Sequence, residues 1–138
     1  MEENGRGKEL EDKNKTINDL DLLRMYVRKV LDHAQSSVEI LYNENYDIET
    51  KYLMCVSFLT SMENARLKLL EHQYNIELFG SDIEQIDEPY EDFVFELKQA
   101  IFNKEDNLTW LQSRYDILYK SGQSAIEALT SMIISNMK

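Results

Sequence analysis

The sequence predicts an all-α protein, an elongated up-down bundle of about four helices with a long C-terminal helix. Large apolar residues recur at three- and four-residue steps, the spacing that places them on one face of a helix. One proline and four glycines among 138 residues leave these periodic segments almost uninterrupted. No segment sustains the alternation of apolar and polar residues that is typical of a strand.

The N-terminal segment differs from the rest of the chain. Residues 1–15 mix charges with Gly5 and Gly7, and Leu10 is their one large apolar residue after Met1. We therefore predict a flexible N-terminal tail over residues 1–15, followed by a single helical-bundle domain over residues 16–138. The tail fits neither a signal peptide nor a membrane span.

The first helix is expected from about Asn18 to Tyr42. Its core face consists of Leu20, Leu23, Val27, Val30, Leu31, Ala34, Val38 and Leu41. Asn43 to Asn45 interrupt the pattern, and Asp47 can then accept the free amide hydrogens that open a second helix. Because so few residues separate the two helices, they should pack antiparallel.

The second helix should end near Gly80, which suits the left-handed residue that often follows a helix. Its apolar stripe consists of Ile48, Tyr52, Cys55, Leu59, Met62 and Leu69. Residues 81–87 are expected to form a loop, and Pro89 is placed where the first turn of a third helix tolerates it. The core face of that helix is predicted to be Tyr90, Phe93, Val94, Leu97 and Ile101.

Asn103 to Asp106 mark a turn or a kink before the last helix, which is expected to continue to about Asn136. Its heptad pattern, typical of a coiled coil, consists of Leu108, Leu111, Tyr115, Leu118, Gly122, Ala125, Leu129 and Met132. Gly122 costs about 1 kcal/mol of helix propensity, but its small size would let another backbone approach. The alternative is a break at residues 121–124, with Ser124 and Glu127 forming a capping box.

The acidity of the chain is concentrated in one segment. The formal net charge is -11, and no Lys or Arg occurs from Leu69 through Leu97. The carboxylates of this segment are Glu71, Glu77, Asp82, Glu84, Asp87, Glu88, Glu91, Asp92 and Glu96. Three interpretations are open: favourable interaction with the dipole of the third helix, a cation site, or a docking surface for a basic partner.

Chemistry-specific motifs are absent from the sequence. The acidic segment lacks the ligand spacing of a calcium loop, and there is no glycine-rich phosphate loop and no paired Cys or His spacing. His33 and His72 lie off the main apolar stripes of their helices, and Cys55 lies on one. We therefore expect no catalytic residue, no cofactor and no metal, and hence a protein that is not an enzyme.

Two short segments nevertheless resemble a known motif. Arg28-Lys-Val-Leu-Asp-His33 and Arg66-Leu-Lys-Leu-Leu-Glu-His72 resemble the Arg-x(4 to 6)-His motif of the HEPN family, whose helical members include metal-independent ribonucleases that work as dimers. The resemblance covers only these few residues. It implies an alternative function as a ribonuclease or toxin-antitoxin component, in which His72 deprotonates the 2'-hydroxyl and Arg66 stabilises the phosphorane.

Two further features concern packing. Arg66 falls at the centre of the apolar stripe of its helix, so it is either part of a structural ion pair or a polar contact in an interface. Phe95 and Phe102 project together away from the core face of the third helix, and Trp110 and Ile117 repeat that offset on the fourth. These side chains are either buried by a helix that lies across the bundle or form an interface.

The sequence as a whole favours a non-enzymatic protein-protein interaction module, such as an adaptor, a complex subunit or a regulatory inhibitor. Its predicted partner-binding residues are Asp82, Glu84, Asp87, Glu88, Glu91, Asp92, Phe95, Phe102, Trp110 and Ile117. The expected partner is another protein with a basic surface, or a second copy of the chain in a homo-oligomer, rather than a nucleic acid or a membrane. The single cysteine excludes an internal disulfide, and we expect a cytoplasmic protein.

Overall fold

The computed structural model of the chain describes residues 2–76 and 83–138, and in these ranges it contains four long helices and no strand. The helices are α1 (Glu2–Tyr42), α2 (Ile48–Ile76), α4 (Asp87–Phe102) and α5 (Leu108–Met137). The structure is 89% helical, and the helices pack against each other. The predicted all-α bundle with a long C-terminal helix is confirmed.

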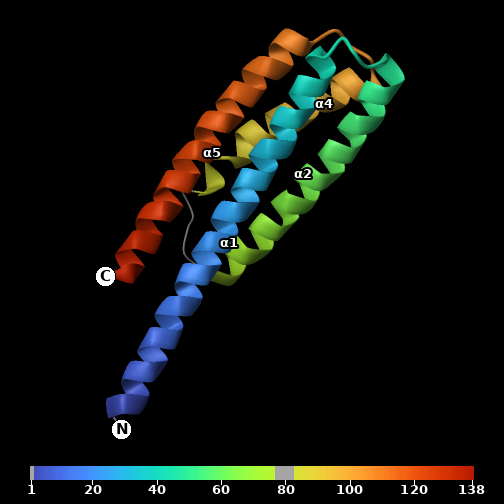
Figure 1. The fold of residues 1–138 in the computed structure, drawn as a ribbon. Coiled ribbons are helices and arrows are strands. Elements are labelled where there is room, and N and C mark those ends of the chain that lie inside the picture. The colour runs from blue at the N-terminus through green and yellow to red at the C-terminus, as the bar shows by residue number, and fades with distance from the viewer. Residues whose placement is uncertain (1, 77–82) are drawn as a thin grey trace.

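The helices run up and down, with α1 between α2 and α5 and with the shorter α4 behind them (Figure 1). α1 packs mainly along α2 and α5, α4 packs mainly along α5, and α2 and α4 make the fewest contacts of these neighbours. The side of the bundle between α2 and α4 is therefore the least tightly closed. This arrangement decides which side chains of these two helices remain exposed.

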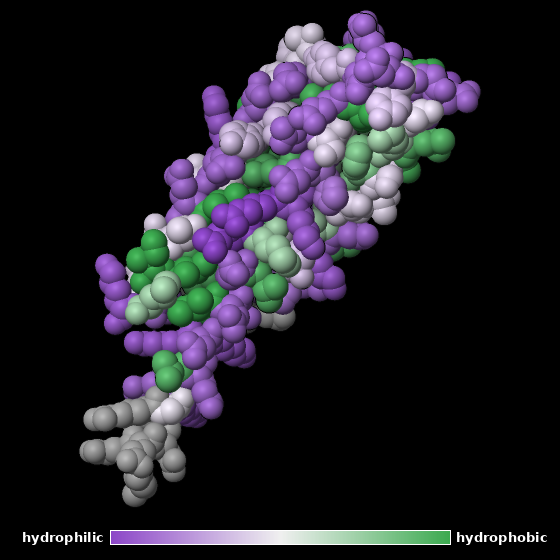
Figure 2. Space-filling model, in the orientation of Figure 1, coloured by the Kyte–Doolittle hydropathy of each residue, from purple (hydrophilic) through white to green (hydrophobic). Residues whose placement is uncertain are grey.

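One hydrophobic core runs along the bundle, and the predicted stripes supply most of it. The fully buried large side chains include Leu20, Leu23, Met62, Leu69, Phe93, Leu97, Leu111, Leu118 and Leu129. The core faces predicted for the third and fourth helices lie in this cluster or against it. Figure 2 shows the visible surface as largely hydrophilic, with hydrophobic areas near the C-terminal end of α5 and along the upper part of α2.

The first helix begins at Glu2, so the start predicted near Asn18 is wrong. Residues 2–15 continue α1 beyond the other helices as a projecting arm (Figure 1), and the side chains described in this arm from Gly7 to Lys15 are exposed. Glu, Lys and Leu favour a helix even without a partner, and a glycine costs only about 1 kcal/mol. The expected flexibility of the tail and the domain limits remain predictions.

The turn between α1 and α2 has the capping geometry predicted for Asp47. The Thr50 backbone N–H donates to Asp47 Oδ1 at 2.7 Å, and the Lys51 N–H donates to the Asp47 carbonyl at 3.0 Å. Hydrogen bonds from Thr50 stabilise the charged carboxylate and lower the pKa of Asp47 below its ordinary value of 3.8. This cap fixes the start of α2 and with it the antiparallel pairing of α1 and α2.

The segment that precedes α4 is more structured than predicted. The sequence predicts a loop over residues 81–87, of which 81 and 82 lie outside the described residues. Over the rest this prediction is wrong, because Ile83 and Ile86 are buried in the core and α4 already begins at Asp87. Two isoleucines three residues apart can both reach one apolar face, which explains why this connection packs inward. Pro89 lies in the first turn of α4 as predicted, whereas the predicted helix end near Gly80 lies outside the described residues.

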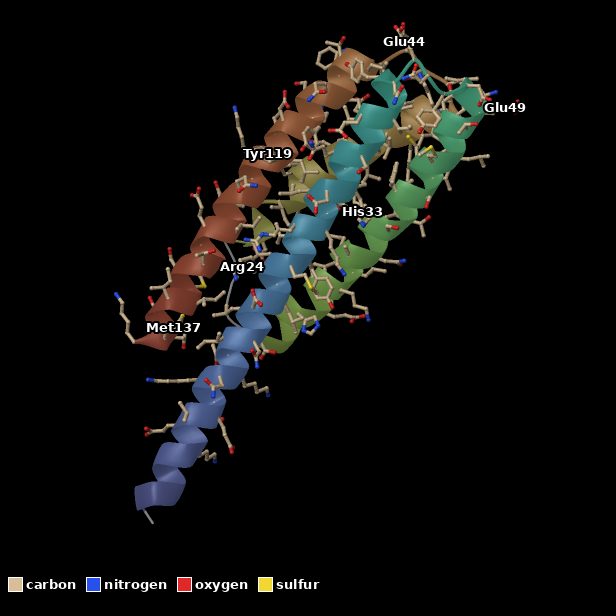
Figure 3. The ribbon with its side chains drawn as sticks, in the orientation of Figure 1. Arg24, His33, Glu44, Glu49, Tyr119 and Met137 are labelled. Carbon is tan, nitrogen blue, oxygen red and sulfur yellow. The ribbon has the colours of Figure 1, made fainter. Side chains whose placement is uncertain are left out.

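The last helix is continuous through Gly122, so the predicted single helix is confirmed and the alternative break is wrong. A Cβ atom added at Gly122 would lie 2.7 Å from Leu31 Cδ1 and 2.8 Å from Leu31 Cδ2. The glycine therefore provides the space into which Leu31 of α1 inserts. The Arg24 guanidinium of α1 also donates to Thr130 Oγ1 of α5 at 3.2 Å, and Figure 3 shows Arg24 between these two helices.

Candidate functional site

The outer face of α4 carries the exposed aromatic residues that the sequence indicated. Phe95 is 58% exposed and Phe102 is 60% exposed, so the alternative in which α4 buries them is not what the structure shows. At 3.6 residues per turn, both phenylalanines share a sector of about 60° with the exposed Glu88 and Glu91. The first half of this face is acidic and the second half is aromatic.

A second set of exposed apolar residues lies on α2, facing the same side of the bundle. Lys98 Nζ of α4 lies 3.6 Å from Glu63 Oε1 of α2, so the faces around these two residues are adjacent. Helical phase places Phe95 and Phe102 within about 60° of Lys98 on α4, and the exposed apolar residues of α2 within about 40° of Glu63. Those residues of α2 are Val56, Leu67 and Leu70.

We call this side of the molecule the α2–α4 face, and it consists of Val56, Leu67, Leu70, Glu88, Glu91, Phe95 and Phe102. The sequence reasoning missed its three α2 residues. Their spacing in the sequence could have revealed them. Leu67 follows Val56 after 11 residues and Leu70 follows Leu67 after three, and both spacings keep the residues on the same side of a helix. Exposed apolar residues that gather on adjacent helices are typical of interfaces.

Trp110 and Ile117 are also exposed, Trp110 by 63%, but they belong to α5. The Arg114 guanidinium carbon lies 5.9 Å from the centre of the Trp110 ring, a cation-π contact within one helix. Among the described residues, no ring contact or ion pair joins this pair to Phe95 or Phe102. Within the described ranges, the two exposed pairs therefore lie on different helices, without such a contact to join them.

The acidic segment is divided among several structural roles. Glu84, Glu88, Glu91 and Asp92 are exposed, whereas Glu77 and Asp82 lie outside the described side chains. Three other carboxylates have partners: Glu71 lies 3.6 Å from Lys68, Glu96 accepts a hydrogen bond of 2.7 Å from Asn107, and Asp87 pairs with Arg66. The carboxylates that remain free to meet a partner are concentrated at the start of α4.

Arg66 forms the structural ion pair that was one of its two predicted roles. Its Nη2 donates to Asp87 Oδ1 at 3.0 Å, and its guanidinium carbon lies 4.5 Å from the centre of the Tyr90 ring. Burial raises the pKa of Tyr90 to about 12, so the phenol stays neutral beneath the cation. These contacts attach the start of α4 to α2.

Replacing Asp87 with asparagine should destabilise the bundle by about 1 kcal/mol. The Arg66 side chain is mostly buried and its Nε already lacks a hydrogen-bond partner, so it would lose its one charged partner. The effect stays modest because the Asp87 side chain is 39% exposed to screening solvent. Urea unfolding measures the change, and Glu88→Gln serves as the control, with a smaller change expected. Equal stability of D87N and the wild type would contradict a stabilising ion pair.

The Arg and His residues of the two HEPN-like segments are engaged with different neighbours. Arg66 contacts α4, whereas the His72 ring stacks on Tyr26 of α1, with ring centres 5.5 Å apart and planes inclined by 22°. Arg28 is exposed, and His33 is half-buried beside α2, as Figure 3 shows. The described contacts therefore direct the Arg66 and His72 side chains to separate helices.

Other candidate chemistry is sparse in the described part of the chain. Cys55 is buried, its thiol lies 3.6 Å from the Ser37 carbonyl oxygen, and burial raises its pKa to about 12, which leaves no thiolate for nucleophilic attack. Residues 2–76 and 83–138 contain no group of three His, Cys, Asp or Glu side chains arranged to hold a metal ion. Over the same residues, no helix combines the length and apolarity needed to cross a bilayer.

Comparison of the chain with protein-family models, with curated proteins and with solved structures finds no match.

Proposed function

We propose that this chain is a non-enzymatic protein-protein interaction module, an adaptor, complex subunit or small inhibitor, that docks its partner on the α2–α4 face. The exposure of Phe95 and Phe102, 58% and 60%, carries the proposal. Large aromatic side chains are the commonest energetic anchors of interfaces, and a soluble bundle gains no stability by exposing two of them on one helix.

The partner we propose is an amphipathic helix with basic residues at one end and apolar residues at the other. Phe95 and Phe102 would receive its apolar side chains, as apolar surfaces receive amphipathic helices in other complexes. Glu88, Glu91 and the nearby exposed Glu84 would attract its basic end and accelerate association. Two basic residues beside this face are already paired, Lys98 with Glu63 and Arg66 with Asp87.

The double variant Phe95→Ser, Phe102→Ser tests the proposal. We expect its circular dichroism and melting temperature to stay close to those of the wild type, because neither ring is buried. Capture of the native partner should fall by tenfold or more, since truncating one interface anchor costs about 2 kcal/mol or more. Affinity capture from the source cells, followed by binding measurements with the identified partner, provides the readout.

Leu10→Ser, Met137→Ser is the matched control, because it removes two exposed apolar side chains far from this face. Unchanged binding by the Phe95, Phe102 variant, or equal loss in the control, would contradict docking on the α2–α4 face. Charge reversal at Glu84, Glu88 and Glu91 should slow association mainly at low salt, because exposed charges are screened at high salt.

Two other outcomes would redirect the proposal. If the Phe95, Phe102 variant has a smaller sedimentation mass than the wild type, the partner is a second copy of the chain. If the wild type cleaves RNA and His72→Ala does not, the HEPN-like alternative replaces the interaction module.

A further inference from the structure

A groove between α1 and α2 has the opposite electrostatic character to the α2–α4 face. It is open to solvent, has a volume of about 390 Å³ and is lined by Tyr26, Lys29 and His33 of α1 and by Ser61, Asn64 and Lys68 of α2. This volume lies within the range of about 300 to 1,000 Å³ that is typical of small-molecule sites. Figure 3 shows His33 between the two helices that form the groove.

No carboxylate lines this groove, although the chain has 26 acidic residues. Its charged side chains are two lysines, one from each helix, together with a histidine. In a chain with a net charge of -11, a groove whose own lining carries no acid repels an anion less than the acidic surfaces do.

Among the described residues, three polar side chains of the groove have no polar partner, and its two lysines have weak ones. Within the described part of the chain, His33, Ser61 and Asn64 make no side-chain hydrogen bond and no ion pair. Lys29 Nζ makes a cation-π contact with the Tyr26 ring, whose centre is 5.8 Å away. Lys68 Nζ lies 3.6 Å from Glu71 Oε2, and both side chains of that pair are more than half exposed. Such exposed contacts are weak and easily exchanged.

The Tyr26 ring gives the groove a fixed wall. It stacks on His72 of α2, so its position is set by a neighbouring helix rather than by solvent. We propose that this groove binds a small organic molecule that carries a phosphate group. The two ammonium groups and the hydroxyl, amide and imidazole groups supply donors to phosphate oxygens, and the Tyr26 side supplies a surface for the organic part.

Nuclear magnetic resonance titration of the full chain tests this proposal, with AMP as the probe and adenosine as its phosphate-free counterpart. We expect AMP to cause saturable shifts of the amide signals of residues 26–33 and 61–68, with a Kd of about 1 mM or tighter. Adenosine should cause none of these shifts. Binding of inorganic phosphate alone, with no binding of AMP, would assign the groove to the free ion and overturn the organic ligand.

Two pairs of variants separate a site from general attraction. Lys29→Gln with Lys68→Gln should weaken AMP binding by about tenfold or more, because it removes both charged donors. Lys8→Gln with Lys120→Gln changes the net charge equally at two exposed positions outside the groove, and it should change the Kd by less than about twofold. Equal weakening by both pairs would overturn the proposal.

Ser61→Asp offers an independent test because it adds a carboxylate to the groove and removes neither lysine. It should abolish the AMP-dependent shifts while circular dichroism stays unchanged. Retained AMP binding by S61D, or tighter binding of a short single-stranded RNA than of AMP at the same residues, would overturn the small-molecule site. These binding tests are independent of docking at the α2–α4 face, because the groove and that face have no residue in common.

Discussion

Replacing Phe93 with alanine should destabilise the protein by about 3 to 5 kcal/mol. Phe93 is 0% exposed and is the largest of the fully buried side chains described. Its ring packs edge-on against the Tyr115 ring of α5, with the ring centres 6.3 Å apart. Truncation would leave a cavity at the contact between α4 and α5. Since a domain of this size holds only about 5 to 15 kcal/mol, much of the variant would unfold on mild heating.

Phe95→Ala is the matched control, the same substitution two residues along the same helix. Because Phe95 is 58% exposed, its truncation should change the free energy of unfolding by no more than about 0.5 kcal/mol. Urea unfolding of both variants, followed by circular dichroism, measures the difference. Similar destabilisation by F93A and F95A would mean that α4 is rotated relative to the bundle described above, and it would remove the basis of the proposed docking face.

Gly122→Leu should lower the free energy of unfolding by about 3 kcal/mol. The new Cβ would fall within 3 Å of both terminal methyl groups of Leu31, and the rest of the leucine side chain would need space that the buried Leu31 already fills. Leucine has a better helix propensity than glycine by less than about 1 kcal/mol, which is too small to offset the overlap. The net result is a lower melting temperature.

Leu31→Ala provides the control for Gly122→Leu, because it removes the side chain that the new leucine would strike. Alone it should cost about 2 to 5 kcal/mol through the cavity it leaves. Together, the two changes roughly exchange the large and the small side chain across the contact between α1 and α5. The double variant should therefore be clearly more stable than the sum of the single losses predicts, and simple additivity would contradict the direct contact.

The helices could be predicted from the sequence because their signal is local. Residues such as Leu118 and Leu129 are buried where the three- and four-residue spacing places them, and Asp47 caps α2 because its carboxylate needs to reach only three residues along the chain. The continuity of α5 through Gly122 was also predictable from the unbroken heptad pattern.

The remaining features depend on which helix lies beside which, and periodicity does not specify this. The position of Arg66 on an apolar stripe predicts that it needs a partner. That this partner is Asp87 follows only from the packing of α4 beside α2. The sequence shows that Phe95 and Phe102 point away from the core face of their helix. It does not show whether another part of the protein covers them. Ile83 and Ile86 were assigned to a loop because two apolar residues are too short a pattern to define a helix face.

The packing of α1 against α5 has a consequence for the synthesis of this protein. α1 and α2 can pair as soon as both have left the ribosome, but the face of α1 that receives α5 stays uncovered until residues 108–137 have been made. At about 5 to 20 residues per second, the ribosome needs roughly 3 to 12 s to add the chain from residue 77 to residue 137. During that interval Leu31 and its neighbours present an apolar strip to solvent or to a chaperone. The space at Gly122 that finally receives Leu31 is among the last parts of the described core to be made.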